Sequence, residues 1–112
     1  MTDSILTSTK KLFGLEEDYV DFDVDIITYI NSAFMALNQI GVGPTTGFLI
    51  EDKTATWTTY FGTTSNLESA KTYVYLKVRL IFDPPSIASV IEAMERQAQE
   101  IEWRLMTQAE GG

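Results

Sequence analysis

One helical segment, Leu67–Phe82, constrains the fold of this 112-residue chain more than any other part of it. Its apolar residues recur at the spacing of an α-helix, yet they fall on two sides of the helical wheel. One side carries Leu67, Ala70, Val74, Val78 and Ile81, and the other carries Tyr73, Leu76 and Leu80. A helix that is apolar all round is usually packed between other elements, so we expect this helix at the centre of the fold.

Both ends of this segment carry recognisable signals. Ser65 and Glu68 have the spacing of a capping box, in which each side chain bonds a backbone N–H of the first turn. The sequence Asp83-Pro84-Pro85 ends the helix, because proline disfavours helical geometry in the residue before it and has no N–H to donate.

Two further helices are predicted before this one. Residues 4–13 form a short amphipathic pattern followed by Gly14, a residue suited to the left-handed end of a helix. A second helix is predicted to begin near Asp21 or Asp23, either of which can cap it, and to end at Gly41. Its core stripe consists of Ile26, Ile30, Ala33, Leu37 and Ile40, broadened by Ile27 and Phe34.

The last helix is predicted to begin between Pro85 and Ser89 and to end near Gln108. Its core stripe consists of Ile87, Val90, Ile91, Met94, Ala98, Ile101 and Leu105. We therefore expect the first part of this helix to be anchored to the domain. Trp103 lies roughly 160° from the stripe, and residues 107–112 are predicted to form a flexible tail.

Residues 41–62 lack helical periodicity and separate two well-formed helices. The stretch 41–47 is rich in turn residues, and Phe48–Ile50 is predicted as a short strand. Residues 54–61 favour a single helical turn, with a strand as the alternative because of their threonine and aromatic content. We expect this segment to project from the helical body as a loop, with Trp57 in the core.

These patterns together predict a mainly α fold in a single domain over residues 1–112. It is a small bundle of about four helices, with a loop or β-hairpin insertion between the second and third helices.

The composition excludes several classes of function. The chain has no histidine and no cysteine, which removes disulfides, Cys/His zinc sites, cysteine nucleophiles and Ser-His-Asp machinery. Its 16 acidic and 8 basic residues give a net charge of −8, which disfavours binding to phosphate backbones and anionic membranes. We expect a soluble protein with no secretory signal and no membrane span, which is not an enzyme.

Two local patterns suggest ligand sites but fail in detail. Asp21, Asp23 and Asp25 have the opening spacing of an EF-hand loop, yet Ile26 and Ser32 stand where that loop needs glycine and glutamate. The glycine-rich turn segment lacks the lysine of a phosphate-binding loop and follows a helix instead of a strand. We therefore predict no metal site and no cofactor.

Surplus apolar residues indicate an interface instead. The core stripe of the last helix is complete without Trp103 and Met106, and aromatic residues, methionine and arginine are enriched in interfaces. The predicted oligomer or partner surface consists of Trp103, Arg104 and Met106, together with Val42, Pro44 and Phe48 of the insertion.

Several segments share their order with a known family. They are Ile5-Leu6 through Lys10-Lys11-Leu12-Phe13-Gly14, the aspartate-rich entry to the second helix, Leu67-Glu68 to Tyr73, Tyr75 to Pro85, and Met94-Glu95-Arg96 to Glu102-Trp103-Arg104-Leu105. In this order the chain resembles the small head–tail connector, or adaptor, proteins of tailed bacteriophages. The resemblance covers most of the chain and contains no catalytic signature.

The resemblance implies a helical core and assembly into a dodecameric ring beneath the phage portal. It implies the portal and a stopper or next connector protein as partners, with genome DNA passing through the lumen without sequence-specific binding. It also implies a place in the neck of the virion, after assembly in the host cytoplasm, and a portal contact near the end of the chain. Two alternatives stay open: a small acidic adaptor or regulatory module acting as a monomer or dimer, and a small enzyme that uses carboxylates.

Overall fold

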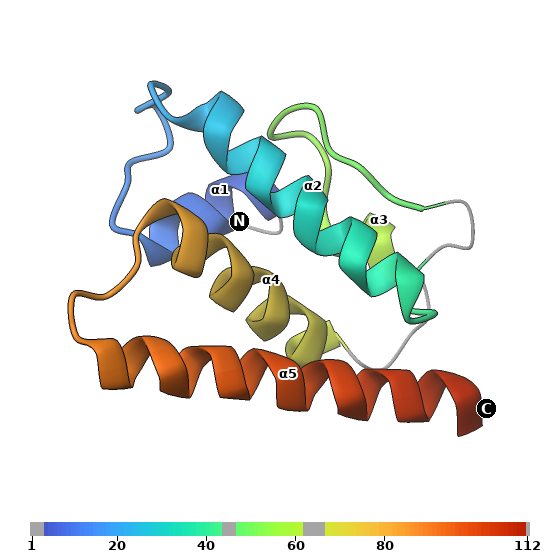
Figure 1. Ribbon diagram of the computed structural model, residues 1–112. Helices are drawn as coiled ribbons and strands as arrows, with labels where there is room; N and C mark the ends of the chain where they lie inside the picture. The colour runs from blue at the N-terminus through green and yellow to red at the C-terminus, as the bar shows by residue number, and fades with distance from the viewer. Residues whose placement is uncertain (1–3, 44–46, 62–66, 112) are drawn as a thin grey trace.

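The computed structural model describes residues 4–43, 47–61 and 67–111 as five helices around one core (Figure 1). The helices are α1 (Ile5–Leu12), α2 (Asp23–Gln39), α3 (Trp57–Phe61), α4 (Leu67–Phe82) and α5 (Ala88–Gly111). The described residues contain no strand, so the mainly α fold is confirmed while the predicted strand at Phe48–Ile50 is wrong. The five helices exceed the predicted four because α3 is a separate short helix.

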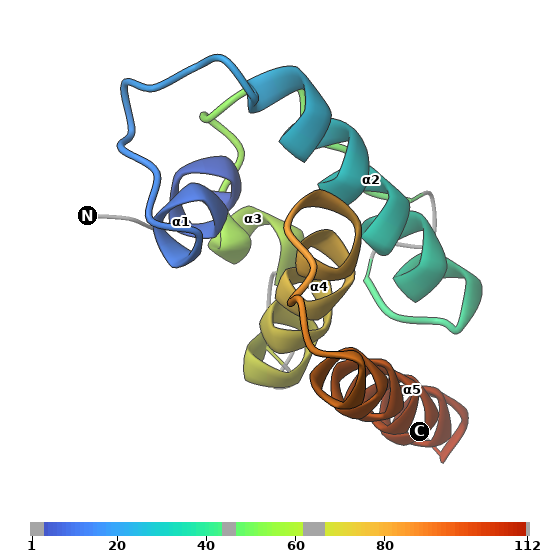
Figure 2. The ribbon, with the colours of Figure 1, turned by 60° about the vertical axis from the view of Figure 1, so that its left-hand side comes forward.

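Helix α4 lies at the centre of the fold, as its all-round apolar pattern predicts. It packs against α2 on one side and against α5 on the other (Figures 1 and 2). Its buried residues, from both predicted sides of the wheel, are Ala70, Tyr73, Val74, Leu76 and Val78. The helix ends at Phe82, directly before Asp83-Pro84-Pro85. The predicted capping residue Ser65 lies outside the described residues.

Helix α5 packs on α4 through its C-terminal half. Its buried residues are Ala98, Ile101 and Leu105. Ile87 and Val90, predicted for the same stripe, are 60% and 41% exposed, so the prediction is wrong for these two residues. The stripe begins with the half-buried Ile91 and Met94, and the helix is anchored from there to Leu105. Figure 1 shows the reason: α4 and α5 cross at an angle and diverge toward the turn that joins them. For the same reason Ile81, in the last turn of α4, is also exposed.

The C-terminal end of α5 lies further along the chain than predicted. The helix continues to Gly111, whereas its apolar pattern predicts an end near Gln108. The flexibility of residues 107–112 stays a prediction, because a helical backbone alone does not test it.

Helix α1 and the start of α2 are joined by a buried ion pair. Lys10 is only 2% exposed, and its Nζ lies 2.9 Å from Asp23 Oδ1 and donates to the backbone oxygen of Glu17 at 2.9 Å. The sequence predicts Asp21 or Asp23 as the cap of α2, but Asp21 precedes the cap position and Asp23 is the first helical residue; Phe22 occupies the cap position without a side-chain hydrogen bond. The prediction of an aspartate cap is therefore wrong, because the Asp23 carboxylate faces Lys10 instead. Gly14, as predicted, follows α1 with a left-handed φ of 77°.

The described part of the insertion, residues 47–61, packs against the body instead of projecting from it. The side chain of Asn31 on α2 holds it: Nδ2 donates to the backbone oxygen of Ile50 at 3.0 Å, and the Ile50 N–H donates to Oδ1 at 2.7 Å. Trp57, predicted in the core, is 3% exposed, and its indole donates to Ser8 Oγ. A hydroxyl cap from Thr56 begins α3, which confirms the short helix over the alternative strand.

The ion pair between Lys10 and Asp23 yields a stability prediction. We expect Asp23→Ala to lower the free energy of unfolding by about 3 kcal/mol, because it leaves a buried ammonium uncompensated. Asp25→Ala is the matched control in the same helical turn, and its expected loss is under about 1 kcal/mol, from the helix dipole alone. Urea unfolding measures both, and a Lys10→Met/Asp23→Ala double variant should recover most of the loss. Equal losses for the two aspartates would contradict the assignment.

Two glycines of the insertion, Gly43 and Gly47, allow a second comparison of stability between similar variants. Gly43 and Gly47 both have φ of 89°, but an added Cβ would lie 2.8 Å from Tyr60 Oη at Gly43 and would meet nothing within 4 Å at Gly47. Either alanine substitution imposes the left-handed strain of about 1–2 kcal/mol. Gly43→Ala must in addition displace the buried Tyr60 ring, so we expect the larger loss of stability there in urea unfolding. A Gly47→Ala protein that is the less stable of the two would refute this.

Candidate functional site

The face of α5 that points away from α4 presents an exposed tryptophan. Trp103 is 63% exposed, while Ile101 and Leu105 on the same helix are buried against the core. The predicted separation of Trp103 from the core stripe is thus confirmed. An indole that is mostly in water adds little to the stability of the single chain, and tryptophan is enriched in protein interfaces.

The residues next to Trp103 on α5 differ from one another in exposure and in their contacts. Arg104 is exposed and forms an ion pair with Glu100 one turn earlier, at 2.5 Å. Met106 is half-buried. The Glu102 side chain is directed toward α4, where its carboxylate accepts a hydrogen bond from the hydroxyl of Tyr73. Burial, reinforced by the bond to Glu102, raises the pKa of Tyr73 above its ordinary value, so the phenol stays protonated and ties α5 to α4.

The predicted site residues of the insertion belong to a different part of the surface. Val42 and Phe48 are half-buried and pack against the core, where the Phe48 ring contacts Phe34 and Tyr60 at centroid distances of 5.4 and 5.0 Å. Pro44 lies outside the described residues. Figure 1 places the turn after α2 and the C-terminal end of α5 at the same end of the molecule. Phe48 therefore serves the fold, and its partner contact stays a prediction.

The structure also exposes apolar residues that the sequence patterns assigned to the core or did not single out. Met35 and Leu49 are 57% and 60% exposed and line a shallow hollow beside Phe48. Where α4 and α5 diverge, Ile81 and Ile87 are exposed too. Helical periodicity gives no signal for such residues, because it reports which side of a helix is apolar and not where a neighbouring helix ends.

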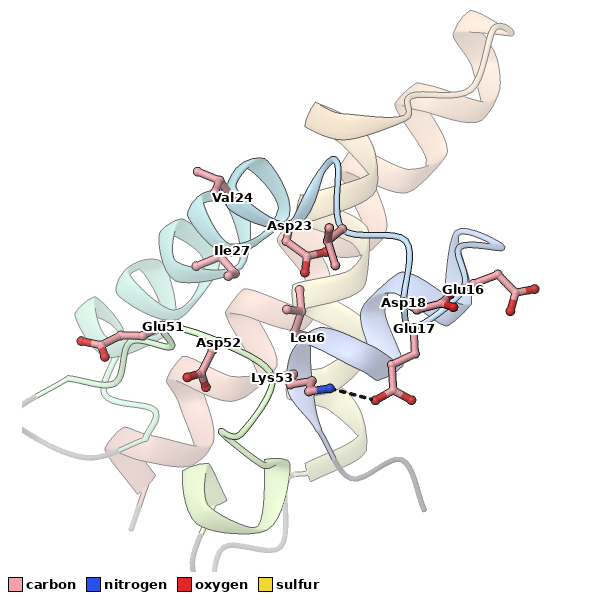
Figure 3. Close-up of a pocket in the computed structure, with 11 residues that line it drawn as sticks. Leu6, Glu16, Glu17, Asp18, Asp23, Val24, Ile27, Glu51, Asp52 and Lys53 are labelled. Carbon is pink, nitrogen blue, oxygen red and sulfur yellow. Dashed lines mark ion pairs between the residues drawn. The ribbon is translucent and has the colours of Figure 1, made fainter.

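An acidic groove runs beside α1. It has a volume of about 850 Å³ and lies between the 16–23 linker, the start of α2 and the 51–53 loop (Figure 3). Its apolar lining consists of Leu6, Val20, Val24 and Ile27, and its carboxylates are Glu16, Glu17, Asp18, Asp23, Glu51 and Asp52. Lys53 spans the groove to Glu17 at 3.6 Å. The sequence pattern marked only part of this groove, because Glu51 and Asp52 reach it from a distant segment.

The chemistry available at these surfaces is binding chemistry. Among the described residues, no three histidine, cysteine, aspartate or glutamate side chains are placed to hold a metal ion. Asp23 faces Lys10, so the aspartates before α2 do not form a calcium loop. In the same part of the chain, no helix is long and apolar enough to cross a bilayer. Burial raises the pKa of Tyr60 to about 12, but this phenol belongs to the core around Phe34.

The described part of the chain is thus a helical domain that exposes Trp103 on the side of α5 away from the core. A family model described as phage connector protein matches residues 5–112. The chain therefore belongs to the phage connector protein family, whose members are structural proteins. Neither the search of curated proteins nor the search of solved structures returns a match.

Trp103 and Leu105 give a direct test of which residues support the fold. We expect Trp103→Ala to change the free energy of unfolding by less than about 0.5 kcal/mol, because the indole is exposed. Leu105→Ala removes a side chain that is 1% exposed and should cost about 3 kcal/mol. Urea unfolding of the two variants under one set of conditions measures both values. A Trp103→Ala loss close to that of Leu105→Ala would place the indole in the core instead.

Proposed function

We propose that this protein forms a ring beneath the phage portal, extends the DNA channel and docks the stopper or next connector of the tail. The observation that carries the proposal is the exposed Trp103 on the face of α5 that the core does not need. Membership of the connector family supplies the structural class, and the ring, portal and stopper are the finer steps of the proposal. The virion neck is the corresponding location, reached after assembly in the host cytoplasm.

The C-terminal half of α5 is the proposed portal contact. Tyr73 and the buried Leu105 fix this half of the helix on α4, so Trp103 is presented on a rigid support. A preorganised aromatic residue loses little conformational entropy on binding, which favours affinity. Trp103, Arg104 and Met106 supply the aromatic, charged and flexible apolar contacts that are common at interface centres.

The charge of the chain suits a channel that lets DNA pass. A net charge of −8 on each copy gives a ring a strongly negative field. Such a wall repels phosphates and provides no sequence-specific grip, which is the behaviour required for a genome moving through it. The monomeric or dimeric adaptor remains the competing function, and the measured mass of the assembled protein separates the two.

The proposal is tested by portal binding and by mass. We expect wild-type protein to give ring-sized particles by mass photometry and to co-purify with its portal protein. Trp103→Ala/Met106→Ala should weaken portal binding by about tenfold or more, because central aromatic anchors dominate interface energies. Glu95→Ala, on an exposed part of the same helix, is the control and should bind as wild type does.

The outcomes separate the parts of the proposal. Portal binding retained by the double variant would exclude the end of α5 as the portal contact. A wild-type mass of one or two chains, with and without portal, would exclude the ring and favour the adaptor.

A further inference from the structure

We propose that neighbouring copies in the ring meet through two different surfaces beside α1: the acidic groove of one copy receives a basic face of the next. This inference rests on the proposed ring and names its subunit contact. The groove is lined by six carboxylates and one ammonium around an apolar floor. The basic face is defined as Lys11 and Leu12 of α1 together with Lys71, Tyr75 and Arg79 of α4.

The groove has the composition of a surface that receives a cationic partner. Leu6, Val24 and Ile27 supply apolar area at its base, and Val24 is 77% exposed in the single chain. Figure 3 shows Glu51 and Asp52 on one side of the groove and Glu17 and Asp18 on the other, so carboxylates line both sides. The lining carries six carboxylates against one ammonium, and a basic partner offsets this excess of negative charge.

The basic face has the matching composition in a chain that is acidic overall. Lys11 and Lys71 line a hollow of about 590 Å³ between α1 and α4, with Leu12 and Tyr75 as its apolar part. Leu12 is 59% exposed. Arg79, one turn beyond Tyr75, donates to the Tyr75 hydroxyl at 3.1 Å. Glu68 lies at this hollow and Asp83 lies beside Arg79, so the face carries three cations and two acids.

The positions of the two surfaces suit a closed ring. Successive residues of α1 are turned by about 100°, which places Leu6 of the groove roughly 120° from Leu12 and roughly 60° from Thr9 of the basic hollow. The surfaces are therefore different but adjacent, and Lys11 lies with Glu16 and Glu17 at a small hollow between them. The two surfaces share no lining residue. An interface made by two different surfaces of a subunit is head-to-tail, and such contacts close into rings when the rotation between copies permits.

Charge reversal tests this pairing. One variant carries Glu16→Lys/Glu51→Lys in the groove, and the other carries Lys11→Glu/Lys71→Glu on the basic face. Each variant alone should need about tenfold or more protein to form rings, because like charges then face each other. A 1:1 mixture should restore rings, since the basic groove of one variant fits the acidic face of the other. Mass photometry at low salt measures the ring fraction.

Controls separate this pairing from simpler explanations. Glu92→Lys/Glu95→Lys makes the same change in net charge as the groove variant, but on exposed α5 positions, and should assemble as wild type does. Circular dichroism melts of all variants check the fold, and restored assembly in the mixture shows independently that both variants are folded. Wild-type rings should weaken in about 1 M salt, where screening shortens the reach of charges to about 3 Å.

Three results would overturn the inference. Wild-type-like assembly of each variant alone would exclude these surfaces while leaving the ring intact. Loss of assembly that the mixture does not restore would mean that the two surfaces do not pair with each other. A wild-type chain that forms no ring, with or without portal, would remove the proposed ring and this contact together.

Discussion

The burial of α4 on all sides is the constraint on which the rest of the structure depends. A helix with apolar residues around its whole circumference is stable in water only when neighbours cover it. In this chain α2 covers one side and the C-terminal half of α5 covers the other (Figure 2). Helix α1 and the insertion complete the core, because their apolar side chains pack against the apolar surface of α2 and α4 that α5 does not cover.

The same arrangement determines which surfaces remain for partners. Because α4 and α5 diverge toward the turn that joins them, the start of α5 is exposed. The residues that attach α5 to the core are Ala98, Ile101 and Leu105. The hydrogen bond between Tyr73 and Glu102 holds this part of α5 on α4. The exposed Trp103 therefore lies within a stretch of helix that is attached to the core. Rigid support of an exposed aromatic residue is a property of binding surfaces, whereas a loose tail would order only on binding.

The sequence predicted the elements well and the contacts between them less well. Helical period, prolines and glycines are local signals, so the bounds of α1 and α4 and the core stripe of α2 were accessible. The pairing of Lys10 with Asp23 and of Asn31 with Ile50 depends on segments brought together by folding. No local pattern distinguishes a lysine that faces solvent from one that reaches a carboxylate on another element. The acidic groove was missed for the same reason, since its walls come from separate segments.

The charges of the chain are unevenly distributed over its surface. A chain with 16 acidic and 8 basic residues repels its own copies at a distance. Association therefore requires that cations be concentrated where a neighbour's carboxylates are dense. Lys10 is unavailable because it is buried with Asp23, whereas Lys11, the next residue, is exposed at the basic hollow. Adjacent lysines thus differ in role: Lys10 secures α1 within the domain, whereas Lys11 is exposed and belongs to the surface proposed for the contact between copies.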